Sequence, residues 1–227
     1  MLSEDTVTVQ RGWWFSTHEQ WKTLLLPYLD VPLVRAVFLN AEKVRLLDAH
    51  LHAIPGLLAS INDVTDGSED IPSYAGACGV AEVAFENIQR RDLLTPYGSY
   101  ALFLHDPAVG LCWYNNMLKG PRMQMRYGSM EAVNANGTEI SPLTTWDSKI
   151  TTVLAMTGGI GALTQRALAS EKVAFNGHNA YEEFYNIVEQ EHKLVFGSVQ
   201  ELKGLSVPLL PPSASVPHVL SDWDIQC

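Results

Sequence analysis

The sequence is poor in cysteine and in basic residues, and both shortages exclude classes of function. Its 227 residues contain three cysteines, Cys78, Cys112 and Cys227, with no CxxC pair. This excludes a zinc ribbon and a thioredoxin-like motif and permits at most one disulfide. The 15 basic residues are outnumbered by 25 acidic ones, giving a net charge of −10. Because nucleic acids and anionic membranes require clustered positive charge, we expect neither as a partner.

Several longer signals are also absent. No run of about 18 apolar residues exists, so no membrane-spanning helix is expected. The first ten residues, MLSEDTVTVQ, lack the basic and then apolar profile of a signal peptide. The compartment therefore stays open: secreted if a longer parent carries an upstream signal peptide, otherwise cytoplasmic. HExxH and GxSxG motifs are missing as well, which argues against zinc and serine hydrolases. We predict no metal and no cofactor.

What the sequence does contain is helical periodicity. Apolar residues recur three and four positions apart, or small residues dominate, in segments 17–29, 33–52, 74–89, 105–118, 146–168 and 179–196. The last part, from about residue 197, is rich in proline and serine and is expected to be extended. These patterns predict one mainly α domain over residues 1–227, with a core at 12–196 and a tail at 197–227. A repeated Tyr-Gly-Ser at 97–99 and 127–129 suggests stacked helical hairpins, as in a toroid.

The stretch from Arg126 to Ala155 is the part that points most clearly to chemistry. Asp147 follows Trp146 at the start of a predicted helix, and Glu131 precedes the intervening loop. Aromatic rings contact the C–H faces of sugars and carboxylates bind sugar hydroxyls, so this pattern favours a carbohydrate-cleaving site. A compatible alternative is that Asp147 is the N-cap or a first-turn carboxylate, placed at the positive end of the helix dipole.

A second candidate lies among three tryptophans, at positions 13, 14 and 21, which surround His18 and Glu19. A glutamate in apolar surroundings would suit the role of general acid. The alternative is a capping box, with Ser16 as the N-cap and Glu19 three residues later. A third candidate is Asp63 in the loop SINDVTDG. This loop lacks the glutamate that an EF-hand requires, so Asp63 either lines a polar cleft or belongs to an ordinary solvated loop.

Taken in order, these segments resemble the C-terminal half of glucoamylase-like (α/α)6 glycoside hydrolases of the endo-β-1,2-glucanase type. Residues 55–67 resemble the family's GLTASDxPDG loop, and 75–85 stand where its small-residue helix follows. Residues 126–134, RYGSMEAVN, resemble RYGFxDAFN. Trp146-Asp147-Ser148 falls where GIDQG precedes an apolar helix, although only the aspartate of that motif is kept. The order agrees over about residues 12 to 168.

The resemblance implies an inverting glycosidase that acts on a β-glucan without a metal. Such a mechanism places a carboxylic acid and a carboxylate base about 6.5–9.5 Å apart. By this resemblance Asp147 is the base or a sugar ligand, and Glu131 lines the cleft. Glu19 is assigned as the acid from its aromatic setting alone. The expected substrate-binding residues are Trp14, His18, Asp63, Tyr127, Asn134 and Trp146.

The helix count is a departure from that family. A complete toroid has about twelve helices, and this sequence predicts about six; half a toroid would expose the apolar flank that the missing half covers. Three explanations stay open: the chain is truncated, a homodimer completes the ring, or the toroid prediction fails. Two alternative functions also remain, namely a non-catalytic carbohydrate-binding or assembly module, and a structural helical-repeat protein whose aromatic residues belong to the core.

Overall fold

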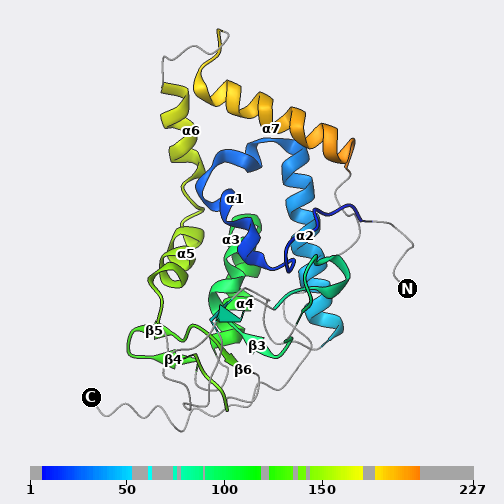
Figure 1. The fold of residues 1–227 in the computed structure, drawn as a ribbon. Helices are drawn as coiled ribbons and strands as arrows, with labels where there is room; N and C mark the ends of the chain where they lie inside the picture. Colours follow the sequence, from blue (N-terminus) through cyan, green and yellow to red (C-terminus); the bar gives the residue numbers. More distant parts are fainter. Residues whose placement is uncertain are drawn as a thin grey trace.

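The fold is known from a computed structural model. It describes residues 7–52, 61–62, 74–75, 78–88, 90–118, 123–134, 138–141, 144–170 and 177–199. Within these ranges the chain is mainly helical, as predicted (Figure 1). The α-helices are α1 (Trp21–Leu25), α2 (Pro32–Leu51), α3 (Tyr100–His105), α4 (Pro107–Leu118), α5 (Trp146–Met156), α6 (Gly161–Ser170) and α7 (Ala180–Phe196).

Short 3-10 helices and strand pairs complete the described structure. The 3-10 helices are η1 (Thr17–Gln20), η2 (Pro27–Asp30), η3 (Ala81–Val83) and η4 (Pro96–Ser99). The two-residue strands are β1 (Ile61–Asn62), β2 (Tyr74–Ala75), β3 (Leu93–Leu94), β4 (Gln124–Met125), β5 (Gly128–Ser129) and β6 (Val133–Asn134). They pair antiparallel as β1–β2, β3–β6 and β4–β5.

Helices α1, α3 and α5 lie side by side and run in the same direction. Their carboxyl ends meet at Gly159, where an added Cβ would lie 2.8 Å from the carbonyl oxygen of Leu24 and 3.3 Å from Leu104. Near their amino ends, the Tyr100 hydroxyl donates a hydrogen bond to the carbonyl of Thr17, and η4 contacts both η1 and α5. In Figure 1, α5 begins beside β4 and β5 and runs away from them towards α6. This common direction places the starts of all three helices at one end of the layer.

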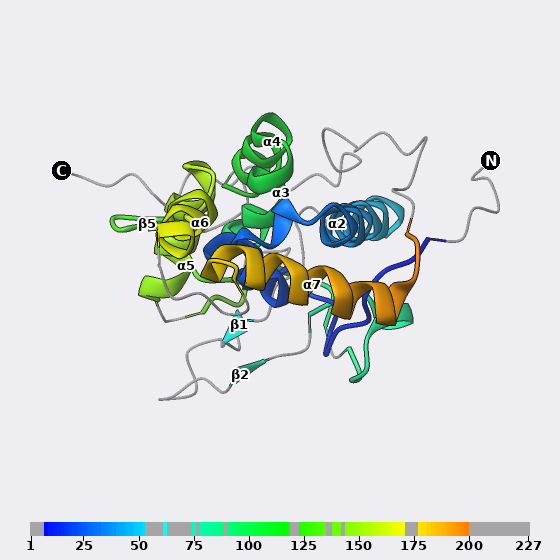
Figure 2. The ribbon, with the colours of Figure 1, turned by 90° about the horizontal axis from the view of Figure 1, so that it is seen from above.

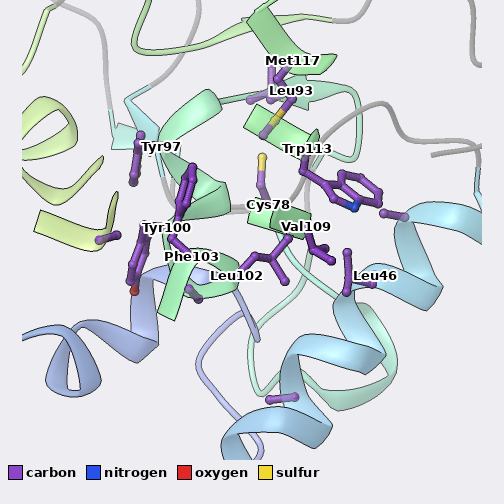
Figure 3. Close-up of a cluster of buried hydrophobic side chains, with 14 of the residues drawn as sticks. Leu46, Cys78, Leu93, Tyr97, Tyr100, Leu102, Phe103, Val109, Trp113 and Met117 are labelled. Atoms are coloured by element: carbon purple, nitrogen blue, oxygen red, sulfur yellow. The ribbon is translucent and has the colours of Figure 1, made fainter. Parts of the chain in front are cut away.

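The main hydrophobic core joins α2, α3 and α4 (Figure 3). Trp113, Tyr100 and Leu102 are fully buried there, and Leu46 reaches them from α2. Helix α7 crosses α2 and η2 (Figure 2) through a smaller cluster that contains Val34 and Val188. The core thus holds together the layer formed by α1, α3 and α5, the three-helix layer. Helix α7 packs on the surface of α2 and η2.

The helix predicted over 33–52 is confirmed, with bounds Pro32–Leu51, but the helix predicted over 17–29 is broken into η1, α1 and η2. The break falls at Leu26, which has an extended backbone with φ −119° and ψ 153°. Because Pro27 follows, steric contact with the proline ring disfavours the helical conformation at Leu26.

The predicted helix over 74–89 is wrong. The elements in the described residues of this segment are the strand β2 and the short 3-10 helix η3. The backbone N–H of Val80 donates to the carbonyl of Trp14 at 3.1 Å, and that of Phe85 donates to the carbonyl of Gly12 at 2.9 Å. These bonds to a distant segment replace the intrahelical ones, so tertiary pairing overrides the helix preference of the small residues.

The single buried helix predicted over 146–168 is also wrong. It is divided into α5 and α6 by Gly158 and Gly159, whose φ angles of 86° and 74° belong to the left-handed region that glycine adopts without strain. Helix α6 has no buried residue, and Leu163 is 60% exposed. The apolar side chains of α6 are therefore not buried by the described part of the chain.

The two Tyr-Gly-Ser sequences do not form a structural repeat. The first occupies η4, whereas the second lies in the β4–β5 hairpin. The division into a core at 12–196 and an extended tail stays a prediction, since the chain beyond residue 199 lies outside the described ranges. No helix in the described residues is long and apolar enough to cross a membrane.

Candidate functional site

The acidic candidates lie at the amino-terminal end of the three-helix layer. Asp147 belongs to the first turn of α5, and Glu19 belongs to η1, directly before α1. Glu131 follows the β4–β5 hairpin and packs on the start of α5. Because η4 contacts both η1 and α5, these three carboxylates lie near the amino-terminal ends of α1 and α5, on either side of η4.

Glu131 is a buried carboxylate that holds the start of α5. It is 3% exposed. Its Oε2 accepts hydrogen bonds from the hydroxyls of Thr145 at 2.6 Å and Ser148 at 2.7 Å. Thr145 is the N-cap residue of α5, yet its side chain makes no capping bond. The hydroxyl turns to Glu131 instead, so this carboxylate orients the first turn rather than facing solvent.

Asp147 and Trp146 project from that first turn. Both are exposed, Trp146 to 79%. Of the two structural roles considered for Asp147, the first-turn carboxylate is confirmed and the N-cap is Thr145 instead; a carboxylate in the first turn interacts favourably with the positive end of the helix dipole. An exposed indole beside an exposed carboxylate is an arrangement that can contact a sugar ring and its hydroxyls.

Lys149 is a basic residue of this site that the sequence patterns did not indicate. Its Nζ donates to the carbonyl and, at 3.2 Å, to the hydroxyl of Ser129 in β5. Burial lowers the pKa of Lys149, and the negative charge of Glu131 opposes that shift. No local motif marks this lysine, because its importance comes from the fold that brings β5 against α5.

Two predicted substrate ligands of the same region differ in accessibility. Tyr127, in the β4–β5 turn, is 64% exposed, whereas Asn134 is 4% exposed. The amide of Asn134 donates to Thr138 Oγ1 at 3.0 Å and accepts from the Glu139 N–H at 3.0 Å. Asn134 is therefore engaged in shaping its own loop, and Tyr127 is open to a ligand.

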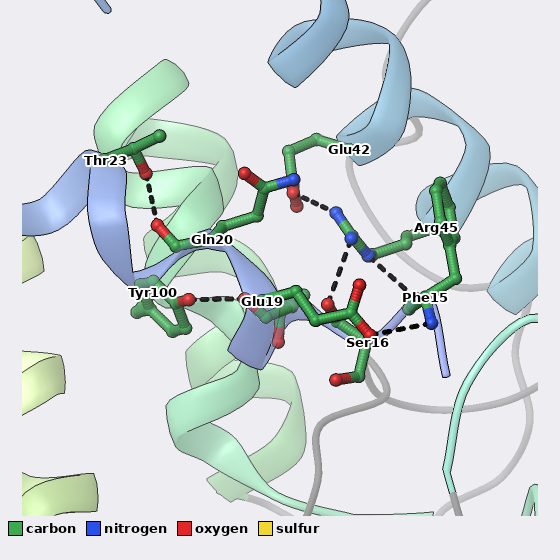
Figure 4. Close-up of polar contacts among 9 residues, drawn as sticks. Phe15, Ser16, Glu19, Gln20, Thr23, Glu42, Arg45 and Tyr100 are labelled. Carbon is green, nitrogen blue, oxygen red and sulfur yellow. Dashed lines mark hydrogen bonds and ion pairs between the residues drawn. The ribbon is translucent and has the colours of Figure 1, made fainter. Parts of the chain in front are cut away.

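The Glu19 carboxylate organises a tight turn just ahead of it (Figure 4). Its Oε1 accepts hydrogen bonds from the backbone N–H groups of Trp14 at 2.9 Å and Phe15 at 3.0 Å. Phe15 has φ of 56°, the one described non-glycine residue in the left-handed region. The Ser16 capping box is not formed, since Ser16 makes no side-chain capping bond. Glu19 instead satisfies two amides of a strained turn.

A buried ion pair supports the same turn from α2. Arg45 donates to the carbonyls of Phe15 at 3.1 Å and Ser16 at 3.0 Å, and its guanidinium lies 4.5 Å from the centre of the Phe15 ring. Glu42 neutralises Arg45; burial raises the pKa of Glu42, while Arg45 acts in the opposite direction. A positively charged group held against two carbonyls explains how a phenylalanine persists in this conformation.

The other aromatic candidates surround this turn. Trp14 and His18 are partly buried. The His18 ring centroid lies 4.1 Å from that of Trp21, and Trp13, 55% exposed, meets Trp14 edge to face at 6.2 Å. Asp63 lies outside the described residues. Within those residues, no group of three or more His, Cys, Asp or Glu side chains could hold a metal ion.

The structure brings Glu131 directly against the Asp147 turn, and it places Glu19 across η4 from them. A cavity of about 330 Å³ lies elsewhere, between η2 and α6. None of the predicted site residues lines this cavity. The three carboxylates therefore lie outside this cavity, which is partly open to solvent. We call the region around them the carboxylate face; Glu131 is buried there, Glu19 is partly buried and Asp147 is exposed.

Comparison with known proteins shows the family to which the chain belongs. A family model described as Endo-beta-1,2-glucanase SGL matches residues 1–227. The chain belongs to this endo-β-1,2-glucanase family. The family resemblance and the mainly helical fold class predicted from the sequence are thereby confirmed. No curated protein matches the chain.

Two solved structures of a family relative align with the chain. They are the endo-β-1,2-glucanase of Talaromyces funiculosus in complex with sophorose, and a glutamate-to-glutamine mutant of that enzyme with β-1,2-glucan. Each is 38% identical, with a TM-score of 0.79, over 95% of this chain and 43% of the relative. The relative has a helical toroid fold. The chain thus spans less than half of the solved enzyme's length.

Proposed function

We propose that this chain acts on a β-1,2-linked glucan as a glycoside hydrolase, by an inverting mechanism with two carboxyl groups. The observation that carries this proposal is the 38% identity to a glucanase solved with sophorose and with β-1,2-glucan. The exposed carboxylate and indole at the start of α5 are consistent with it. Water replaces the leaving sugar at the anomeric carbon, so one bond to that carbon forms as the glycosidic bond breaks.

In this proposal Asp147 is the base and Glu19 the acid. The Asp147 carboxylate takes a proton from the attacking water, and the Glu19 carboxyl gives a proton to the departing glycosidic oxygen. Glu131 acts through α5: by binding Thr145 and Ser148 it fixes the turn that presents Asp147. That the relative was studied with its glucan as a glutamate-to-glutamine mutant is consistent with a glutamate as the acid.

The aromatic residues supply the sugar contacts of the proposed site. The exposed rings of Trp146 and Tyr127 offer flat surfaces for the C–H faces of glucose units, while Trp14 and His18 line the side nearer Glu19. Asp63 remains part of this proposal from the sequence alone. No metal or cofactor is assigned a role.

The test is release of reducing ends from β-1,2-glucan, with proton NMR to read the anomer first formed. We expect Asp147→Asn and Glu19→Gln each to lower kcat by about 100-fold or more. The matched control is Glu191→Gln on exposed α7, which should keep full activity. Activity retained in both site variants would contradict the residue assignment, and formation of the retained anomer would contradict the inverting mechanism.

A non-catalytic carbohydrate-binding module is the second candidate. It is favoured by one observation, that Glu19 Oε1 already accepts two backbone hydrogen bonds. Binding of sophorose is measured by calorimetry, and hydrolysis by the release of reducing ends at high concentration of the chain alone. Binding without any release would favour this function over hydrolysis.

A further inference from the structure

The cavity between η2 and α6 is a second polar site that the proposed reaction does not use. Its volume of about 330 Å³ is at the lower end of the range of about 300–1,000 Å³ for small-molecule sites. One wall comes from the end of α1 and from η2, including Leu29 and Asp30. The other comes from the α5–α6 turn and α6, including Gly161, Ala162 and Gln165.

The two walls are fixed to one another by direct hydrogen bonds. The N–H of Ile160 donates to the carbonyl of Leu24 at 2.9 Å, and the hydroxyl of Thr164 donates to the carbonyl of Leu25 at 2.8 Å. Gly161 is close-packed as well, since an added Cβ would lie 3.3 Å from the Leu26 carbonyl oxygen. The cavity is therefore preformed and needs no rearrangement to admit a ligand.

Asp30 and Gln165 are held in place by Tyr181 of α7. The Tyr181 hydroxyl donates to Asp30 Oδ2 at 2.8 Å and also hydrogen-bonds the Gln165 side chain. Burial and the bond to Asp30 raise the pKa of Tyr181 to about 12, so the phenol stays protonated and remains a donor at neutral pH. A carboxylate and an amide are thus oriented on opposite walls of one cavity.

This lining suits an uncharged polyhydroxyl ligand. Asp30 is the one charged side chain among the described residues that line the cavity, so an anion would be repelled. Hydroxyl groups of a sugar match the Asp30 acceptor and the Gln165 amide. The apolar side chains of Leu26, Pro27 and Leu29 offer contact to its C–H faces.

The cavity is at the opposite end of the helices from the carboxylate face. Asp147 lies in the first turn of α5, whereas Gly158 follows its end, and at 1.5 Å per residue these positions are about 16 Å apart. One sugar unit does not reach both places. We infer that the η2–α6 cavity is an independent binding site for a short β-linked glucooligosaccharide, separate from the carboxylate face. The choice of a glucan ligand rests on the proposed function.

The experiment is an NMR titration of the isotope-labelled full chain with sophorose, following backbone amides. We expect two separate sets of shifted signals, one near Trp146 and Asp147 and one at Gly161 and Ala162. Asp30→Ala should raise the Kd measured from the second set of signals about tenfold, as expected for the loss of one hydrogen bond to a charged acceptor. The Kd measured from the first set should not change.

A filling variant gives an independent check. Ala162→Phe places a ring in the cavity and should abolish the second set of shifts, whereas Ala167→Phe, also exposed on α6 but outside the lining, should leave it intact. Shifts at the carboxylate face alone would overturn the second site while the proposed function stands. Shifts at the cavity alone would support the second site while the proposed function falls, and no shifts at either place would overturn both.

Discussion

Single residues at the carboxylate face are constrained by close contacts between charged side chains and backbone. Gly12 leaves no room for a side chain, because an added Cβ would lie 1.5 Å from Glu19 Oε2. The same carboxylate accepts the N–H groups of Trp14 and Phe15. Any side chain at position 12 therefore displaces Glu19 and leaves two amides without their acceptor.

We expect Gly12→Ala to lower the free energy of unfolding by about 1–3 kcal/mol, the cost of losing charge-assisted hydrogen bonds in a part-buried turn. In a Glu19→Ala background the same change should cost little, since the displaced carboxylate is already gone. Urea denaturation of the four proteins of this cycle measures the coupling. Equal costs of Gly12→Ala in both backgrounds would show that the contact with Glu19 is not the cause.

Two aspartates should respond to pH in opposite directions. Burial raises the pKa of Asp48, against the effects of Arg91 and His52, so its contribution to stability is greatest at acidic pH and is lost as pH rises. The hydrogen bond from Arg90 lowers the pKa of Asp92, so its contribution is present at neutral pH and is lost on acidification.

Asp48→Asn should accordingly raise the midpoint of thermal unfolding at pH 7, and the gain should shrink towards about pH 4, near the unfolded value of aspartate. Asp92→Asn should lower the midpoint at pH 7 by a small amount, because Asp92 is 48% exposed, and this loss should also vanish at low pH. Differential scanning calorimetry from pH 4 to 8 measures both. If both variants changed the midpoint of thermal unfolding at pH 7 in the same direction, the opposite pKa shifts of Asp48 and Asp92 would be contradicted.

At the scale of elements, the sequence predicted those helices whose ends are set locally. Helix α7 was expected over 179–196 and is found at Ala180–Phe196, because Asn179 and Glu182 form a complete capping box. The 33–52 prediction succeeded for a similar reason, as Pro32 stands at the first helical position. Elements shaped by distant partners were missed, such as η3, whose flanking residues bond to the backbone of Gly12 and Trp14.

The residues of the candidate site also differ in whether local sequence or distant contacts determine their positions. The position of Trp146 and Asp147 at a helix start was predictable because the signals for it are adjacent in sequence; their role in a site stays a prediction. The partners of Glu131 lie 14 and 17 residues away, and Arg45 lies 29 and 30 residues from the carbonyls that it binds. No spacing rule connects residues that meet only after the layer has assembled.

The capping box of α7 is open to a direct test. Asn179→Ala should destabilise the helix by about 1 kcal/mol, because the Glu182 N–H loses its acceptor at 2.9 Å. Since Val188 is the one described residue of α7 that is buried, we expect faster amide exchange in α7 and little change in global unfolding. Glu183→Ala removes a first-turn carboxylate outside the box and serves as control. Unchanged exchange in Asn179→Ala would contradict the role of the cap.

At the scale of the whole molecule, apolar side chains remain exposed along one succession of helices. They are Val153 and Met156 of α5, Leu163 of α6, and Ile187, Leu194 and Val195 of α7, each between 43% and 80% exposed. Where exposed apolar side chains gather into a patch, that patch commonly marks an interaction site. The solved glucanase is more than twice as long as this chain, and the homodimer that would complete a toroid remains a prediction.

We expect sedimentation velocity to show association that increases with protein concentration, and expect Leu194→Lys with Val195→Lys to reduce it, because charge on an apolar interface is costly to bury. Glu191→Lys on the same helix adds positive charge at an exposed polar position and should leave association unchanged. A single monomeric species at all concentrations would rule out self-association of this chain.

The meeting point of α1, α3 and α5 at Gly159 also determines how the chain would respond to extra residues. Insertions at this turn would separate three helices that share one contact, and the φ of 74° together with the 2.8 Å approach to Leu24 leaves glycine as the fitting residue. At the other end, α1 directly follows η1 and α3 directly follows η4. An insertion at this junction should therefore loosen all three helices together and lower the stability of the whole layer.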